Sequence, residues 1–198
     1  MASRKALFVI DIQNELATDP KTRVPHAARV TAATEGILQA ARSVIDAHLA
    51  QDQRSPCLIV FVQHEESGDD ATMLKGSEAW ELVFTPRPEV GEEILVAKNT
   101  GNTFKSNPGL AARLRAAGVT EIIAVGLQSE RCVEATCKGA LAAGFRVTVL
   151  AGAHSTYDAD GATAVEIERQ VEQRLHTRGV RIARWEEVTT AWVREGKV

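Results

Sequence analysis

One cysteine has the sequence setting of a nucleophile. Cys132 follows the apolar stretch 122–125, a glycine at 126 and a serine at 129, a residue type suited to capping a helix. This spacing predicts a helix that begins near Ser129 and places Cys132 in its first turn. Free backbone N–H groups and the positive end of the helix dipole favour a thiolate there, and the thiolate is the nucleophilic form of cysteine. A buried structural cysteine is the alternative interpretation.

Two further ionisable residues follow apolar runs in the same way. Asp11 interrupts the run 6–12, where an unpaired carboxylate would be costly, and Lys98 closes the run 94–97. Singly, they fit a turn aspartate and a lysine that reaches the surface. If the runs are parallel strands of one sheet, however, Asp11, Lys98 and Cys132 converge at the carboxyl edge, where open α/β sheets bind ligands.

The elements that would position these residues alternate along the chain. Continuous apolar runs, typical of strands buried on both faces, occupy 6–12, 57–63, 94–97, 121–127, 146–150 and 180–185. Helical spacing occupies 27–49, 108–117, 131–143, 160–177 and 186–195. This order predicts a three-layer α/β/α fold, Rossmann-like, with a mostly parallel sheet of about six strands. The segment 64–93 is expected to be a long functional or mobile loop.

The composition is that of a globular enzyme. The 198 residues predict a single domain over 1–198, with 44% apolar residues, 25% charged residues and a net charge of −3. These values argue against disorder and against nucleic-acid or membrane-surface partners. The N-terminal apolar run is too short for a signal peptide, and the three cysteines form no paired framework. We therefore expect a cytoplasmic protein with free thiols.

Several motifs in order resemble one family. They are DIQN at 11–14, GSEAWEL at 76–82, lysine 98 with NTF at 102–104, GLQSERCVEAT at 126–136 and AHSTYD at 153–158. Over nearly its whole length the chain resembles the isochorismatase-like cysteine hydrolases, which include nicotinamidases and N-carbamoylsarcosine amidase. The resemblance implies a catalytic triad of Asp11, Lys98 and Cys132. It also implies a cis peptide between Leu127 and Gln128.

These residue types would hydrolyse a C–N bond. Lys98 would lower the pKa of the thiol, and Asp11 would take its proton and pass it to the leaving amine. Cys132 would attack an amide or carbamoyl carbon and form an acyl-enzyme. The oxyanion would lie on backbone N–H groups of the turn from Leu127 and Gln128 to Cys132.

No metal or other cofactor is expected. The nicotinamidase branch carries zinc after the second strand, where this chain has His64 and Glu66 without a matching histidine in 67–86. Nicotinamide is therefore a less favoured substrate.

The candidates for the substrate pocket are Gln13, Trp80, Phe104 and Ser129. Turn capping is the alternative for Gln13, core packing for Phe104 and a subunit contact for Trp80. Thr103 stands where the family usually has alanine or glycine.

Two other functions stay open. One is an isochorismatase-type vinyl-ether hydrolase with Asp11 as general acid and no covalent step. The other is a binding module with a relict site. In every case the partners expected are a small-molecule substrate and further copies of the chain, as a dimer or tetramer.

Overall fold

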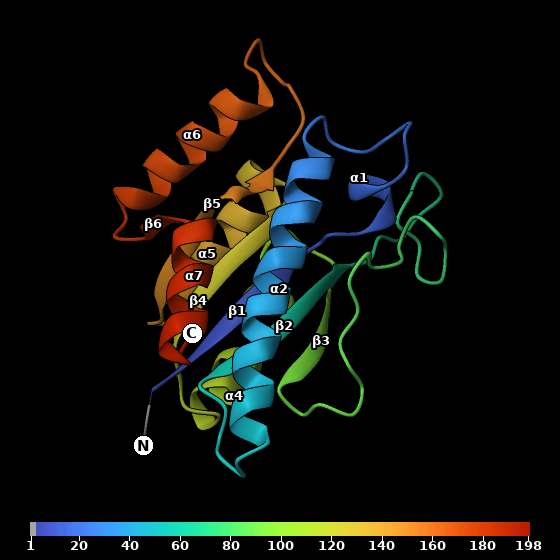
Figure 1. The fold of residues 1–198 in the computed structure, drawn as a ribbon. Coiled ribbons are helices and arrows are strands. Elements are labelled where there is room, and N and C mark those ends of the chain that lie inside the picture. The colour runs from blue at the N-terminus through green and yellow to red at the C-terminus, as the bar shows by residue number, and fades with distance from the viewer. Residues whose placement is uncertain (1–2) are drawn as a thin grey trace.

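The structure is a computed structural model that describes residues 3–198. Six parallel strands form one sheet in the order β3-β2-β1-β4-β5-β6 (Figure 1). The strands are β1 (Arg4–Ile10), β2 (Cys57–His64), β3 (Glu93–Lys98), β4 (Val119–Leu127), β5 (Arg146–Ser155) and β6 (Arg181–Arg184). All five pairings are parallel, so every strand ends at the same edge of the sheet.

Helices cover both faces of this sheet. The long helix α2 (Ala27–Leu49) and the last helix α7 (Trp185–Glu195) lie side by side on one face (Figure 1). The opposite face is covered by α4 (Leu110–Ala116), α5 (Glu134–Ala142) and α6 (Ala164–His176). Successive residues of β1 alternate between the two cores, with Leu7 and Val9 in one and Phe8 and Ile10 in the other. The predicted three-layer α/β/α architecture is confirmed.

Most element boundaries agree with the sequence to within a few residues. Helix α2 begins and ends as predicted, whereas α6 begins four residues later because Thr163 and Glu166 form a capping box there. Strand β5 continues beyond residue 150 to Ser155. Two one-turn helices, α1 (Asn14–Ala17) and α3 (Thr103–Ser106), were not predicted.

The helical segment around Cys132 begins at Ser129, as predicted, but its first turn is π-helical and Ser129 is not its N-cap. A π-helical turn, Ser129–Val133, precedes α5, and the residue before it, Gln128, makes no side-chain cap. The Ser129 hydroxyl is instead 2.8 Å from Nδ1 of the buried His154 on β5. A contact across the sheet has therefore taken the side chain that local spacing assigned to capping.

A glycine of β4 permits close approach to β1 just before Asp11. Gly126 has a φ of 127°, and a Cβ at this position would lie 2.0 Å from the carbonyl oxygen of Ile10. Only glycine therefore fits here. The approach brings the turn after β4 against Asp11, which follows Ile10.

The buried Gln13 amide ties the segment between β2 and β3 to the sheet edge. Its Nε2 donates to the carbonyl oxygens of His64 and Trp80 at 2.9 and 2.7 Å, and its Oε1 accepts from the His64 N–H at 2.8 Å. The segment therefore lies over the carboxyl edge. Within residues 3–198, no helix is long and apolar enough to cross a membrane.

Candidate active site

Asp11, Lys98 and Cys132 meet at the carboxyl edge of the sheet. Lys98 ends β3, Asp11 follows β1, and Cys132 lies in the turn after β4. The Lys98 Nζ lies 2.6 Å from Asp11 Oδ2 and 3.2 Å from Cys132 Sγ. The side chains of Lys98 and Asp11 are both buried, so their charges depend on each other for compensation.

His64 supplies a third partner for Lys98. It ends β2 opposite Lys98 in the strand register, and its Nδ1 is 3.1 Å from Nζ. An ammonium group has three hydrogens, and Asp11, Cys132 and His64 supply one acceptor each. From the sequence, His64 was weighed as a metal ligand or as a surface or hydrogen-bonded residue, and its contact with Lys98 was not predicted. His64 and Lys98 each end an apolar run of the sequence, and this shared position at strand ends was the signal that could have predicted their contact.

The His64 ring is neutral in this site. Burial, and next the positive charge of Lys98, lower its pKa below the ordinary value. Nδ1 must therefore accept from the ammonium group, which leaves the ring hydrogen on Nε2. Nε2 lies 4.0 Å from Glu66 Oε1.

The Cys132 thiol is protonated at rest, so the expectation of a preformed thiolate is wrong. Burial, followed by the negative charge of Asp11, raises the pKa of Cys132 to about 12, although Lys98 acts in the opposite direction. For Lys98, burial lowers the pKa, but Asp11 and Cys132 outweigh it and the net shift is upward. The resting site is thus an ammonium–carboxylate pair beside a neutral thiol.

Asp11 is placed to accept a proton. Its backbone adopts a φ of 49°, in the left-handed region, and its N–H donates to the Val62 carbonyl at 3.0 Å. Beyond the contacts with Lys98 and Cys132, neither carboxylate oxygen receives a hydrogen bond from residues 3–198. The carboxylate therefore has a free acceptor position next to the thiol.

These groups border a cavity of about 240 Å³. Its polar lining consists of Asp11, His64, Glu66, Gln128, Arg131 and Cys132. Its remaining lining consists of Leu16, Met73 and Gly101. The size suits a small molecule or one end of a larger one.

The floor of this cavity is the turn before α5. The peptide between Leu127 and Gln128 is cis, as the family resemblance implies. The N–H groups of Arg131 and Val133 both donate to the Gln128 carbonyl, at 3.2 and 3.1 Å. Those two groups are occupied, so an anion at this turn would use the remaining N–H groups, that of Cys132 among them.

Comparison with known proteins gives the family. The family model of the isochorismatase domain matches residues 5–185. The chain belongs to the isochorismatase family. The predicted family is therefore confirmed.

Individual relatives of this isochorismatase-family protein differ in length and identity. Streptothricin hydrolase from Streptomyces noursei is 34% identical over 184 residues, which are 93% of this chain but only 60% of that protein. The isochorismatase-like hydrolase of Alkaliphilus metalliredigens is 19% identical with a TM-score of 0.78, covering 96% of this chain and 99% of the other. N-carbamoylsarcosine amidase from Thermoplasma acidophilum is 22% identical with a TM-score of 0.66, covering 92% and 96%. The last two likenesses show the fold alone.

The residues that line the cavity in this isochorismatase-family protein differ from the predicted pocket. Gln13 holds backbone groups, and Ser129 is buried against His154. Phe104 packs between Phe8 and Phe145, with ring centroids at 5.8 and 6.0 Å. None of these three residues is among the cavity-lining residues.

Two other positions that the sequence singled out also lie outside the cavity lining. Trp80 packs against the core on the α2 side, and Thr103 is hydrogen-bonded to Thr136 at 2.9 Å. The cavity residues that sequence reasoning missed are Leu16, Met73, Gly101 and Arg131. They come from separate segments with no shared motif, so only folding brings them together.

The described part of the chain, residues 3–198, contains no group of three His, Cys, Asp or Glu side chains placed to hold a metal ion. His64 and Glu66 are the nearest approach to such a group. Nδ1 of His64 is already engaged by the Lys98 ammonium. A metal at Nε2 would have Glu66 as its neighbouring carboxylate.

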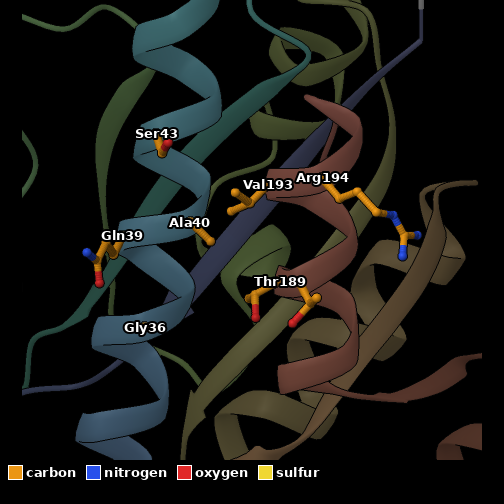
Figure 2. A pocket seen from close by; sticks show the side chains of 8 residues that line it. Gly36, Gln39, Ala40, Ser43, Thr189, Val193 and Arg194 are labelled. Atoms are coloured by element: carbon orange, nitrogen blue, oxygen red, sulfur yellow. The ribbon is translucent and has the colours of Figure 1, made fainter.

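A second depression, of about 570 Å³, lies between α2 and α7 (Figure 2). Its lining includes hydroxyls such as those of Ser43 and Thr189, and Arg194 is its only ionisable residue. It shares no residue with the cavity at Cys132. None of its described lining residues is a histidine or a carboxylate that could act as a general base, so the depression lacks the groups that nucleophilic chemistry requires.

Proposed function

We propose that this protein is a cysteine hydrolase that cleaves the C–N bond of a small amide or carbamoyl compound. The observation that carries the proposal is the meeting of a thiol and a carboxylate at one cavity, with a buried ammonium in contact with both. A nucleophile beside a base that is itself held by a third group is the general arrangement of covalent catalysis.

The first half-reaction acylates Cys132. As Sγ bonds to the substrate carbonyl carbon, its proton passes to Asp11, and the carbonyl π electrons move to oxygen. Backbone N–H groups of the turn from Gln128 to Cys132 receive that oxyanion. When the C–N bond breaks, the leaving nitrogen takes its electron pair and the proton held by Asp11, and a thioester remains on Cys132.

The second half-reaction uses water. Asp11 takes a proton from water as its oxygen adds to the thioester carbon. The C–S bond then breaks, the sulfur leaves with the bonding electrons and recovers the proton, and the acid is released. Lys98 stays an ammonium throughout. In this form it orients Asp11 and stabilises the negative charge that develops on sulfur.

The relatives support the reaction class without giving the substrate. One, 34% identical to this chain, is named a streptothricin hydrolase. Since the chain spans about 60% of the length of that streptothricin hydrolase, its substrate is not carried over.

The deciding experiment compares Cys132→Ala with wild-type protein on a panel of small amides, with release of ammonia or amine as the readout. We expect loss of turnover by at least about a thousandfold and, in wild type, a mass increase on Cys132 equal to the acyl group. Cys137→Ala is the matched control, because Cys137 is buried in α5 and does not line the cavity.

Undiminished turnover in Cys132→Ala would refute the covalent mechanism. A vinyl-ether substrate is assayed in parallel. On that substrate, loss of turnover in Asp11→Ala with activity kept in Cys132→Ala would indicate the vinyl-ether reaction. A protein with no turnover on either substrate class would be the binding module. Cytoplasmic location and a homo-oligomeric state stay predictions, and light scattering checks the latter.

A further inference from the structure

The charges around the catalytic cavity select a class of substrate. We infer that the substrate carries a protonated amine close to its scissile amide, and that the Glu66 carboxylate receives this cation. The inference rests on the proposed function, since it concerns the same cavity.

Glu66 is a fixed carboxylate with one free oxygen. Its Oε2 accepts from the backbone N–H groups of Thr72 and Met73 at 2.9 and 3.2 Å. Among the described residues, Oε1 receives no hydrogen bond, and the nearest basic group is the neutral His64 ring, with Nε2 at 4.0 Å. Because Glu66 lines the cavity that contains Cys132, its free oxygen is available to a ligand there.

The other catalytic charges cancel and leave Glu66 uncompensated. Asp11 and Lys98 form an ion pair, the Cys132 thiol is neutral at rest, and His64 is neutral. Arg131 is the one other charged residue of the lining. The Arg131 side chain is 73% exposed and its Nε lies 3.8 Å from Glu130 Oε1, so it faces solvent and the neighbouring Glu130 carboxylate.

The surface next to the cavity carries negative charge, as Glu66 does. A depression of about 530 Å³ shares the lining residues His64 and Glu66 with the catalytic cavity, so the two adjoin at these residues. It is also lined by Glu65, Asp69 and Asp70, and no lysine or arginine is among its lining residues. A buried oxygen of Glu65, Oε2, has no hydrogen-bond partner in the described part of the chain. Like-charged walls of this kind raise the local concentration of cations and repel anions.

The test measures charge selection at Cys132 without requiring turnover. Three methanethiosulfonate reagents of similar size are used, one with a trimethylammonium group, one neutral and one with a sulfonate. The rate at Cys132, identified by mass spectrometry, is divided by the rate of each reagent with 2-mercaptoethanol. We expect the cationic reagent to exceed the anionic one by about tenfold at low ionic strength, and the ratio to shrink at about 1 M salt.

Glu66→Gln is the informative variant. Glutamine keeps an oxygen for the Thr72 and Met73 N–H groups and removes only the charge, so the fold is retained and a melting curve checks it. The cationic preference should fall severalfold. The control is Glu187→Gln, an exposed charge change on α7, which should leave the ratio unchanged. A ratio near one in wild type, or an equal ratio in Glu66→Gln, would overturn the inference.

Substrates separate this inference from the proposed reaction. The probes are β-alaninamide, propionamide and succinamate, which differ in the charge next to the same primary amide. We expect kcat/KM to be highest for β-alaninamide, and Glu66→Gln to lower it about tenfold with little change for propionamide. Hydrolysis without cationic preference would refute the inference and retain the reaction. Cationic preference of the reagents with no amide hydrolysed would retain the charge selection and refute the reaction.

Discussion

Asp11→Asn should separate the acidity of the thiol from catalysis. After burial, the Asp11 charge is the largest influence that raises the pKa of Cys132 to about 12. Asparagine keeps the shape and removes the charge, so the Lys98 ammonium becomes the dominant charge beside the sulfur. We therefore expect the pKa of Cys132 to fall in this variant, while amide hydrolysis is lost because no base remains.

The size of the effect follows from the pKa. A rise from the ordinary 9.0 to about 12 corresponds to about 4 kcal/mol, so at pH 8 the thiolate is roughly a thousandfold rarer than in an ordinary thiol. A thiolate of higher pKa is intrinsically more nucleophilic, with a Brønsted slope of about 0.4–0.5, which offsets part of this deficit. The wild-type protein should thus react with iodoacetamide roughly 50-fold more slowly than an exposed thiol. Asp11→Asn should react at least about tenfold faster than wild type.

The assay is the alkylation rate of Cys132 between about pH 6 and pH 10, with each cysteine followed by mass spectrometry. Since the raised pKa keeps the thiol neutral below about 12, the wild-type rate should rise about tenfold per pH unit throughout this range. Asp46→Asn, a charge change at an exposed carboxylate on α2, should behave as wild type. A fast wild-type rate that does not change with pH, or an Asp11→Asn protein slower than wild type, would refute the reasoning.

Two further changes test contacts that the structure shows. His64→Leu leaves one Lys98 hydrogen without an acceptor, which costs about 1–3 kcal/mol, so kcat should fall about tenfold or more. His64→Asn restores an acceptor and should recover much of the lost kcat. Equal kcat in both variants would contradict the role of His64 as an acceptor for Lys98. Glu93→Gln breaks buried ion pairs with Arg42 and Arg87 and should lower the free energy of unfolding by about 3 kcal/mol in urea titrations. Burial raises the pKa of Glu93, but the two arginines outweigh it and the net pKa is lowered. The stabilisation is therefore fully present at pH values above the ordinary pKa of 4.5, and it is lost as the pH falls through the lower pKa of the folded state. A gap between Glu93→Gln and wild type that persists in acid would contradict this assignment.

The fold was largely predictable because its signals are local. Continuous apolar runs mark strands buried on both faces, and helical spacing marks the covering helices, so the order of elements predicts the layers. The convergence of Asp11, Lys98 and Cys132 follows from the same logic, since each comes at or just after the carboxyl end of a strand and parallel strands share that edge.

What only the tertiary structure decided depends on contacts between distant segments. Ser129 was expected to cap a helix, but the buried His154 of a neighbouring strand takes its hydroxyl. The cavity wall is completed by Met73 from the long segment that Gln13 holds over the sheet edge. No local pattern encodes such placements.

The protonation state of Cys132, the proposed nucleophile, is the clearest example. The sequence predicted a thiolate from a helix end and from a lysine expected at the same edge of the sheet. The structure adds burial and the Asp11 charge, and together these outweigh Lys98 and keep the Cys132 thiol neutral. A chain's residue types determine which groups can react, whereas the balance of desolvation against paired charges is set by the packing around them.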